Sequence, residues 1–95
     1  MNMAELDRKK TYRNLKKKGF LDAEHREDGH KYLELFHEGR LVLFTRISHS
    51  GNIGTPLIAQ MAMQCGLSNH QFLDLARCPM SQDKYLSILD GKGYL

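Results

Sequence analysis

A histidine in the middle of this chain follows a tight-turn signal and has basic residues close to it in the sequence. His30 comes directly after Asp28-Gly29, and Arg26 and Lys31 are near. Histidine exchanges a proton near neutral pH, and lysine or arginine neutralises charge that grows on a phosphate. These residue types could cleave RNA by acid-base chemistry, with the substrate's own 2′-hydroxyl as the nucleophile. Their spacing alone favours the simpler interpretation of a surface histidine at a hairpin.

A second histidine, His49, lies between two serines and just before Gly51. Amides and hydroxyls of such a loop could hold a phosphate, so His49 is a candidate RNA contact. A histidine that bonds only to its own loop explains the pattern equally well. We interpret the remaining histidines, at positions 25, 37 and 70, as structural or solvent-facing.

The basic residues that could attract a phosphate backbone are concentrated near the start of the chain. Half of the 14 lysines and arginines fall in one stretch, namely Arg8, Lys9, Lys10, Arg13, Lys16, Lys17 and Lys18. Such a segment attracts polyanions, nucleic acid foremost, although a solvated helix face gives the same pattern. We predict that Lys16, Lys17, Arg26 and Lys31 contact RNA phosphates.

Several other classes of function lack their sequence signals. No Cys/His spacing indicates a metal site, and neither a Gly-x-Ser-x-Gly nor a Gly-Lys-Ser/Thr motif occurs. We therefore expect no metal and no cofactor. Cys65 and Cys78 are predicted to be buried or free thiols. No apolar run has membrane-spanning length and the first residues lack a secretory signal, so we expect a cytoplasmic protein without membrane contact.

The whole chain, residues 1–95, is predicted to form one domain, because it is short and 41% hydrophobic. Helix formers span residues 6–18, and segments of strand character follow at 20–26, 31–37 and 40–47. Asp28-Gly29 and Glu38-Gly39 separate them, which predicts a three-stranded antiparallel meander. Helical spacing returns at 55–65, after Ser68, and at 81–90. The predicted class is α+β, in the order α-β-β-β-α with helices packed on the sheet. Its core spans residues 6–77, and a C-terminal helix over 81–90 is appended to it.

Alternation of side chains sorts the strand residues into two faces. One face of the middle strand carries Leu33 and Leu35, and the third strand groups Leu41 with Leu43, provided that no bulge intervenes. The opposite faces carry Tyr32, Glu34, Phe36, Val42 and Phe44. Neither face is wholly polar, so the alternation does not decide which one packs on the core.

The order of these motifs resembles the HicA family of small bacterial and archaeal toxins. The similar stretches are, in chain order, Lys16-Lys17-Lys18-Gly19-Phe20, Asp28-Gly29-His30-Lys31-Tyr32, Glu38-Gly39-Arg40-Leu41-Val42, Ser48-His49-Ser50-Gly51, Gly54-Thr55-Pro56-Leu57 and Gly66-Leu67-Ser68-Asn69-His70-Gln71-Phe72. Each motif is short, and it is their joint order and spacing over roughly residues 6–75 that carries the resemblance.

The resemblance implies a fold like that of a double-stranded-RNA-binding domain and a metal-independent ribonuclease that cleaves messenger RNA. It also implies a neutralising protein partner similar to a HicB antitoxin. The family's catalytic histidine is the one that follows the small residue of its second-strand motif, which corresponds to His30 in this sequence.

The sequence departs from the family pattern at two positions close to His30. Asp28 stands where the family often has glycine and brings a carboxylate that repels phosphate, and Lys31 replaces a frequent second histidine. The chain could therefore be a non-catalytic RNA-binding module of the same fold. It could also be a protein-interaction domain whose C-terminal helices bind a partner.

Overall fold

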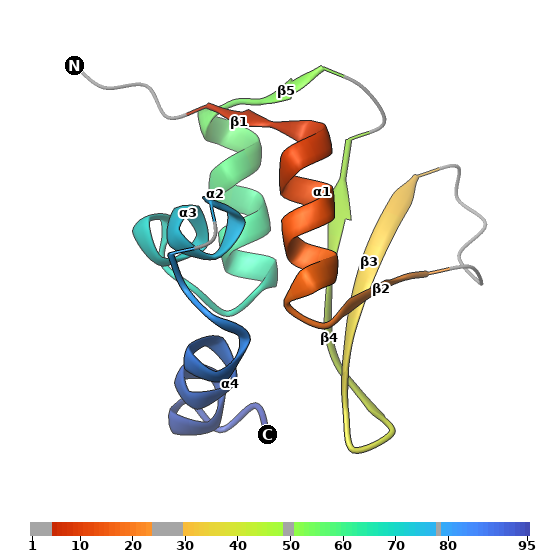
Figure 1. Ribbon diagram of the computed structural model, residues 1–95, viewed down its shortest axis with the longest axis vertical. Coiled ribbons are helices and arrows are strands. Elements are labelled where there is room, and N and C mark those ends of the chain that lie inside the picture. Colours follow the sequence, from red (N-terminus) through yellow and green to blue (C-terminus); the bar gives the residue numbers. More distant parts are fainter. Residues whose placement is uncertain (1–4, 24–29, 49–50, 78) are drawn as a thin grey trace.

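The computed structural model describes residues 5–23, 30–48, 51–77 and 79–95. These residues form a small α+β domain with a three-stranded antiparallel sheet and four helices (Figure 1). The elements follow the order β1 (Leu6–Asp7), α1 (Arg8–Lys17), β2 (Phe20–Asp22), β3 (Lys31–His37), β4 (Arg40–Ile47), β5 (Asn52–Ile53), α2 (Thr55–Gln64), α3 (Asn69–Arg77) and α4 (Gln82–Gly91). The predicted α+β class is thus confirmed.

The main sheet is the predicted meander, with the strand order β2-β3-β4 and antiparallel pairing throughout. β3 and β4 have the predicted bounds, and a tight turn at Glu38-Gly39 joins them. Both turn residues have positive φ, 52° and 78°, which is the backbone geometry that two-residue hairpins require. β2 ends at Asp22, and the rest of the predicted strand lies largely outside the described residues, as does the predicted Asp28-Gly29 turn.

The face of the sheet that packs on the core carries Leu33 and Leu35 of β3, both of which are fully buried. Opposite them in β4 lie Thr45 and Leu43. The register then shifts by one residue, because Leu35 pairs with Leu43 and Phe36 pairs with Leu41. This bulge turns Leu41 toward solvent, whereas unbroken alternation grouped it with Leu43.

Helices cover one face of the sheet, with α1 against β2 and α2 against β4. α3 packs on α1 and α2 from the other side, so the helices themselves form two layers (Figure 1). Two side chains fix these contacts. The Asn14 amide on α1 donates to the Ala76 carbonyl of α3 at 2.7 Å, and the Gln64 side-chain oxygen on α2 accepts from the Thr45 hydroxyl at 2.8 Å. The described helices include none that is long and apolar enough to cross a bilayer.

The start of the chain differs from the prediction of a single helix over residues 6–18. Leu6 and Asp7 form β1, which pairs with β5, and the helix begins only at Arg8. Asp7 then caps the helix, since its carboxylate accepts from the Lys10 amide at 2.9 Å. Residues 52–53, which lie between the last predicted strand and the next predicted helix, supply the partner strand. The β1–β5 pair lies next to the N-terminal ends of α1 and α2 and is separate from the main sheet (Figure 1).

The predicted appended helix over residues 81–90 is α4, and it contributes two fully buried side chains, Tyr85 and Leu89, to the common core. The Tyr85 ring stacks on Phe20 of β2 with 6.0 Å between centroids, and its hydroxyl donates to the Cys65 carbonyl at 2.9 Å.

Cys65 is a buried free cysteine, as predicted, and its burial raises the pKa of the thiol to about 12. Cys78 lies outside the described residues.

Candidate functional site

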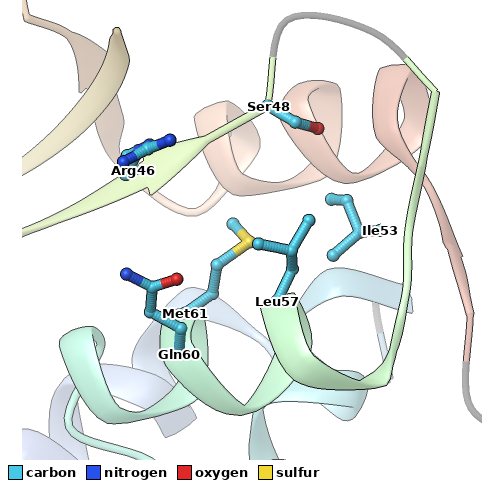
Figure 2. Close-up of a pocket in the computed structure, with 6 residues that line it drawn as sticks. All are labelled: Arg46, Ser48, Ile53, Leu57, Gln60 and Met61. Atoms are coloured by element: carbon cyan, nitrogen blue, oxygen red, sulfur yellow. The ribbon is translucent and has the colours of Figure 1, made fainter.

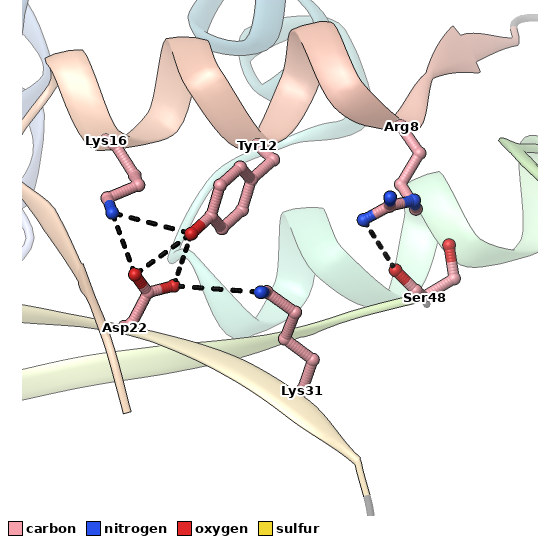
Figure 3. A network of polar contacts seen from close by, with 6 residues as sticks. All are labelled: Arg8, Tyr12, Lys16, Asp22, Lys31 and Ser48. Atoms are coloured by element: carbon pink, nitrogen blue, oxygen red, sulfur yellow. Dashed lines mark hydrogen bonds and ion pairs between the residues drawn. The ribbon is translucent and has the colours of Figure 1, made fainter. Parts of the chain in front are cut away.

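Two of the predicted RNA contacts, Lys16 on α1 and Lys31 at the start of β3, come together in the structure around one carboxylate, Asp22 at the end of β2. Lys16 Nζ lies 2.7 Å from Asp22 Oδ2, and Lys31 Nζ lies 4.0 Å from Asp22 Oδ1. The Tyr12 hydroxyl donates to the same carboxylate at 2.7 and 2.9 Å. We call Tyr12, Lys16, Asp22 and Lys31 the polar cluster (Figure 3).

The electrostatics of the polar cluster follow from these contacts. The hydrogen bond from Lys16, supported by that from Tyr12, lowers the pKa of the Asp22 carboxyl below its ordinary value. The same bond raises the pKa of the Lys16 amine. Asp22 is thus ionised at neutral pH and shared between two ammonium groups, so the cluster keeps a net positive charge. Lys31 also lies over the Tyr12 ring, 4.5 Å from its centroid, which holds its side chain against α1.

His30, the predicted catalytic residue, is exposed and immediately precedes β3. It is therefore the chain neighbour of Lys31, whose ammonium belongs to the polar cluster. An exposed imidazole and a cluster of net positive charge are the kinds of group that proton transfer next to a phosphate requires, and here they are linked through neighbouring positions in the chain. Arg26, His49 and Asp28 lie outside the described residues, so their relation to His30 stays a prediction.

The side of α1 that carries Tyr12 and Lys16 also carries Arg8, because residues four apart share a helix face. Arg8 Nη1 donates to the Ser48 carbonyl beyond the end of β4 at 3.5 Å. Figure 3 shows these side chains pointing from the helix toward the ends of the strands. A carbonyl bond does not cancel the guanidinium charge. We call Arg8, Lys16 and Lys31 the cationic row, which spans the junction between α1 and the strand ends.

The basic stretch that looked uniform in the sequence divides in the structure. Lys17, another predicted RNA contact, is exposed on α1 and does not join the polar cluster. Lys18 is buried, and its ammonium donates to the Met80 carbonyl ahead of α4. Lys18 therefore has a structural role, because its ammonium makes an internal hydrogen bond and is not presented at the surface to a ligand.

Sequence reasoning missed Tyr12 and Asp22, which organise the cluster. A signal for Tyr12 was present, since Tyr12 and Lys16 are four residues apart on one helix. Asp22 gave no such signal, because its partners come from two other elements. Within the described ranges, the structure contains no group of three or more His, Cys, Asp or Glu side chains that could hold a metal ion.

Comparisons of this chain with protein-family models, with curated proteins and with solved structures find no match.

Proposed function

We propose that this domain is a HicA-like endoribonuclease, with a fold of the double-stranded-RNA-binding-domain type, that cleaves messenger RNA without a metal ion. One observation carries the proposal. An exposed histidine, His30, is adjacent in the chain to Lys31, which joins Lys16 in a cluster of net positive charge. The arrangement of three antiparallel strands with α1 and α2 on one face is consistent with this fold type.

In the proposed reaction His30 removes the proton from a ribose 2′-hydroxyl. The resulting oxygen attacks the adjacent phosphorus, and the bond from phosphorus to the 5′-oxygen breaks as that oxygen takes up a proton from solvent. The products are a 2′,3′-cyclic phosphate and a 5′-hydroxyl end. Lys31 and Lys16 stabilise the additional negative charge on the phosphorane, which is where electrostatic catalysis has most effect. A partner similar to a HicB antitoxin would act by covering this surface.

The test is cleavage of single-stranded RNA in the presence of a chelator, with the wild type compared with His30→Ala. General acid-base groups contribute roughly 10²- to 10⁴-fold, so we expect a loss of that size. His70→Ala is the matched control, because His70 is a highly exposed histidine on α3 that lies 3.7 Å from Asp74. The control should cleave like the wild type. Undiminished cleavage by a folded His30→Ala variant rejects the assignment of His30.

A second candidate, the non-catalytic RNA-binding module, is favoured by Asp22. Its carboxylate partly neutralises the two lysines that would stabilise the phosphorane, which opposes their catalytic role, whereas the net positive charge that binds an RNA backbone remains. This alternative predicts salt-sensitive RNA retention by the wild type without cleavage products. Running the cleavage reactions on a native and a denaturing gel therefore separates the two functions, since the first shows RNA retention and the second shows cleavage products.

A further inference from the structure

A small cavity lies between the end of β4 and α2, close to one end of the cationic row. Its volume is about 110 Å³, and Figure 2 shows the residues around it: Arg46, Ser48, Ile53, Leu57, Gln60 and Met61. Ile53 and Met61 are almost fully buried and give the cavity an apolar wall. Gln60 on α2 and Arg46 on β4 are exposed residues and provide polar groups at its edge. The cavity thus combines an apolar wall with a polar rim.

One polar atom in this region is without a hydrogen-bond partner in the described part of the chain. The Ser48 hydroxyl oxygen is buried and has no hydrogen bond to any described residue. A buried hydroxyl without a partner costs free energy, so such a group in a folded protein calls for an explanation, and a bound molecule that supplies the partner is one. The Ser48 hydroxyl is therefore available to a ligand that brings its own donor or acceptor.

The cavity is continuous with the proposed RNA surface through a single residue. The Ser48 carbonyl accepts from Arg8 of the cationic row, while the Ser48 side chain lines the cavity. A nucleic-acid strand that follows the row with its phosphates passes the mouth of this cavity. Bases of single-stranded RNA are free to turn away from the backbone and pack on protein side chains.

We propose that this cavity binds a nucleobase of the RNA strand whose phosphates contact the cationic row. The proposal rests on the proposed function, since it assumes an RNA ligand. A base fits the lining better than a phosphate does, because its faces are apolar and its edge carries donors and acceptors. One face packs on the wall that Leu57 and Met61 form side by side on α2, and the edge bonds to the Ser48 hydroxyl and the Gln60 amide.

Met61 supplies a direct reporter of occupancy. With methionine methyl groups labelled by ¹³C, the Met61 resonance should shift when a nucleoside 5′-monophosphate is added. Met63 lies on the same helix, is 72% exposed and does not line the cavity, so its resonance is the internal control. Ribose 5-phosphate, which lacks the base, should leave Met61 unchanged. A short single-stranded RNA should produce the same shift at a concentration at least tenfold lower.

Arg46→Ala and Gln60→Ala are the test variants, because both side chains are exposed and their removal leaves the core intact. Loss of a base contact of this kind weakens nucleotide binding by about five- to tenfold. Arg40→Ala, at the opposite end of β4 and outside the cavity lining, is the matched control and should bind like the wild type.

Three results overturn the proposal. A silent Met61 resonance at saturating RNA shows that the cavity is not occupied. An equal shift with ribose 5-phosphate shows that it takes a phosphate, and equal affinity for mononucleotide and RNA shows that the natural ligand is a free nucleotide. These failures are distinct from failure of the proposed function. RNA cleaved by the wild type with Met61 silent rejects only the base site, whereas a Met61 shift without cleavage rejects only the nuclease.

Discussion

Lys16 and Lys18 are two residues apart in the chain, yet they belong to regions of opposite character. Lys16 lies in the polar cluster, where its ammonium and that of Lys31 share the partly exposed carboxylate of Asp22. Lys18 is buried and donates to the carbonyl of Met80, which belongs with Phe20, Cys65 and Tyr85 to the hydrophobic core; we call this region the buried corner. A lysine therefore contributes positive charge to the protein surface in the first region, and an internal hydrogen bond that stabilises the fold in the second.

The largest expected effect separates the two regions by stability. Tyr85→Ala removes a fully buried ring that stacks on Phe20, so it should lower the free energy of unfolding by about 3–5 kcal/mol. Tyr12→Phe in the polar cluster should change it by less than about 1 kcal/mol, because the hydroxyl it removes is only partly buried. Urea unfolding followed by circular dichroism measures both. Equal losses would contradict the division into a structural and a surface region.

The next effect distinguishes two neighbouring lysines. Lys18→Met leaves the buried Met80 carbonyl without its donor, which should cost about 1–3 kcal/mol of unfolding free energy. Lys17→Met, at an exposed position, should leave stability unchanged. For RNA binding we expect the opposite, namely a larger effect from Lys17→Met than from Lys18→Met. Lys17→Met should reduce the slope of log affinity against log salt by about 0.7, the value for one phosphate contact on a single strand.

The measurement for this pair is fluorescence anisotropy of a labelled RNA across a salt series, with urea unfolding of the same preparations. Lys18→Met serves as the charge-matched control, since it removes one positive charge without touching the surface. An equal change of salt slope in both variants would mean that net charge, and not a contact at Lys17, sets the affinity.

Much of the fold could be predicted because its signals are local. The bounds of β3 and β4 follow from alternation and from a turn whose geometry Glu38-Gly39 adopts. The pairing of β1 with β5 could not be predicted, since it joins two-residue segments that lie far apart in the chain. The bulge that exposes Leu41 could not be predicted either, because it depends on how the residues of β3 and β4 pair with each other.

The candidate site was predictable to a smaller extent, for the same reason. The sequence indicated that Lys16 and Lys31 are candidate phosphate contacts. It could not show that Asp22 lies between them, because these contacts join residues from three different elements. Composition also could not separate Lys18 from its neighbours. Which lysine of a basic run is buried depends on what packs over the end of the helix, and here that is the segment leading into α4.

The smallest expected effect tests whether Asp22 restrains the cationic row. Asp22→Asn removes the charge that Lys16 and Lys31 share, so RNA affinity should rise by a few fold while the cost in stability stays small, as for exposed ion pairs generally. Asp90→Asn on α4 is the control, because it makes the same change in net charge at an exposed position. An equal gain in both variants would assign the effect to net charge alone.

The pH dependence of stability gives the same test a second readout. The pKa of Asp22 is lower in the folded protein than its unfolded value of about 3.9, so the carboxylate stabilises the fold fully above that pH. The contribution is lost as the pH falls through the lower, folded-state pKa. Wild type should therefore lose more stability than Asp22→Asn on acidification below about pH 4. Parallel acid titrations of the two proteins would show that Asp22 gains nothing from Lys16, and the difference between the surface cluster and the buried corner would then rest on exposure alone.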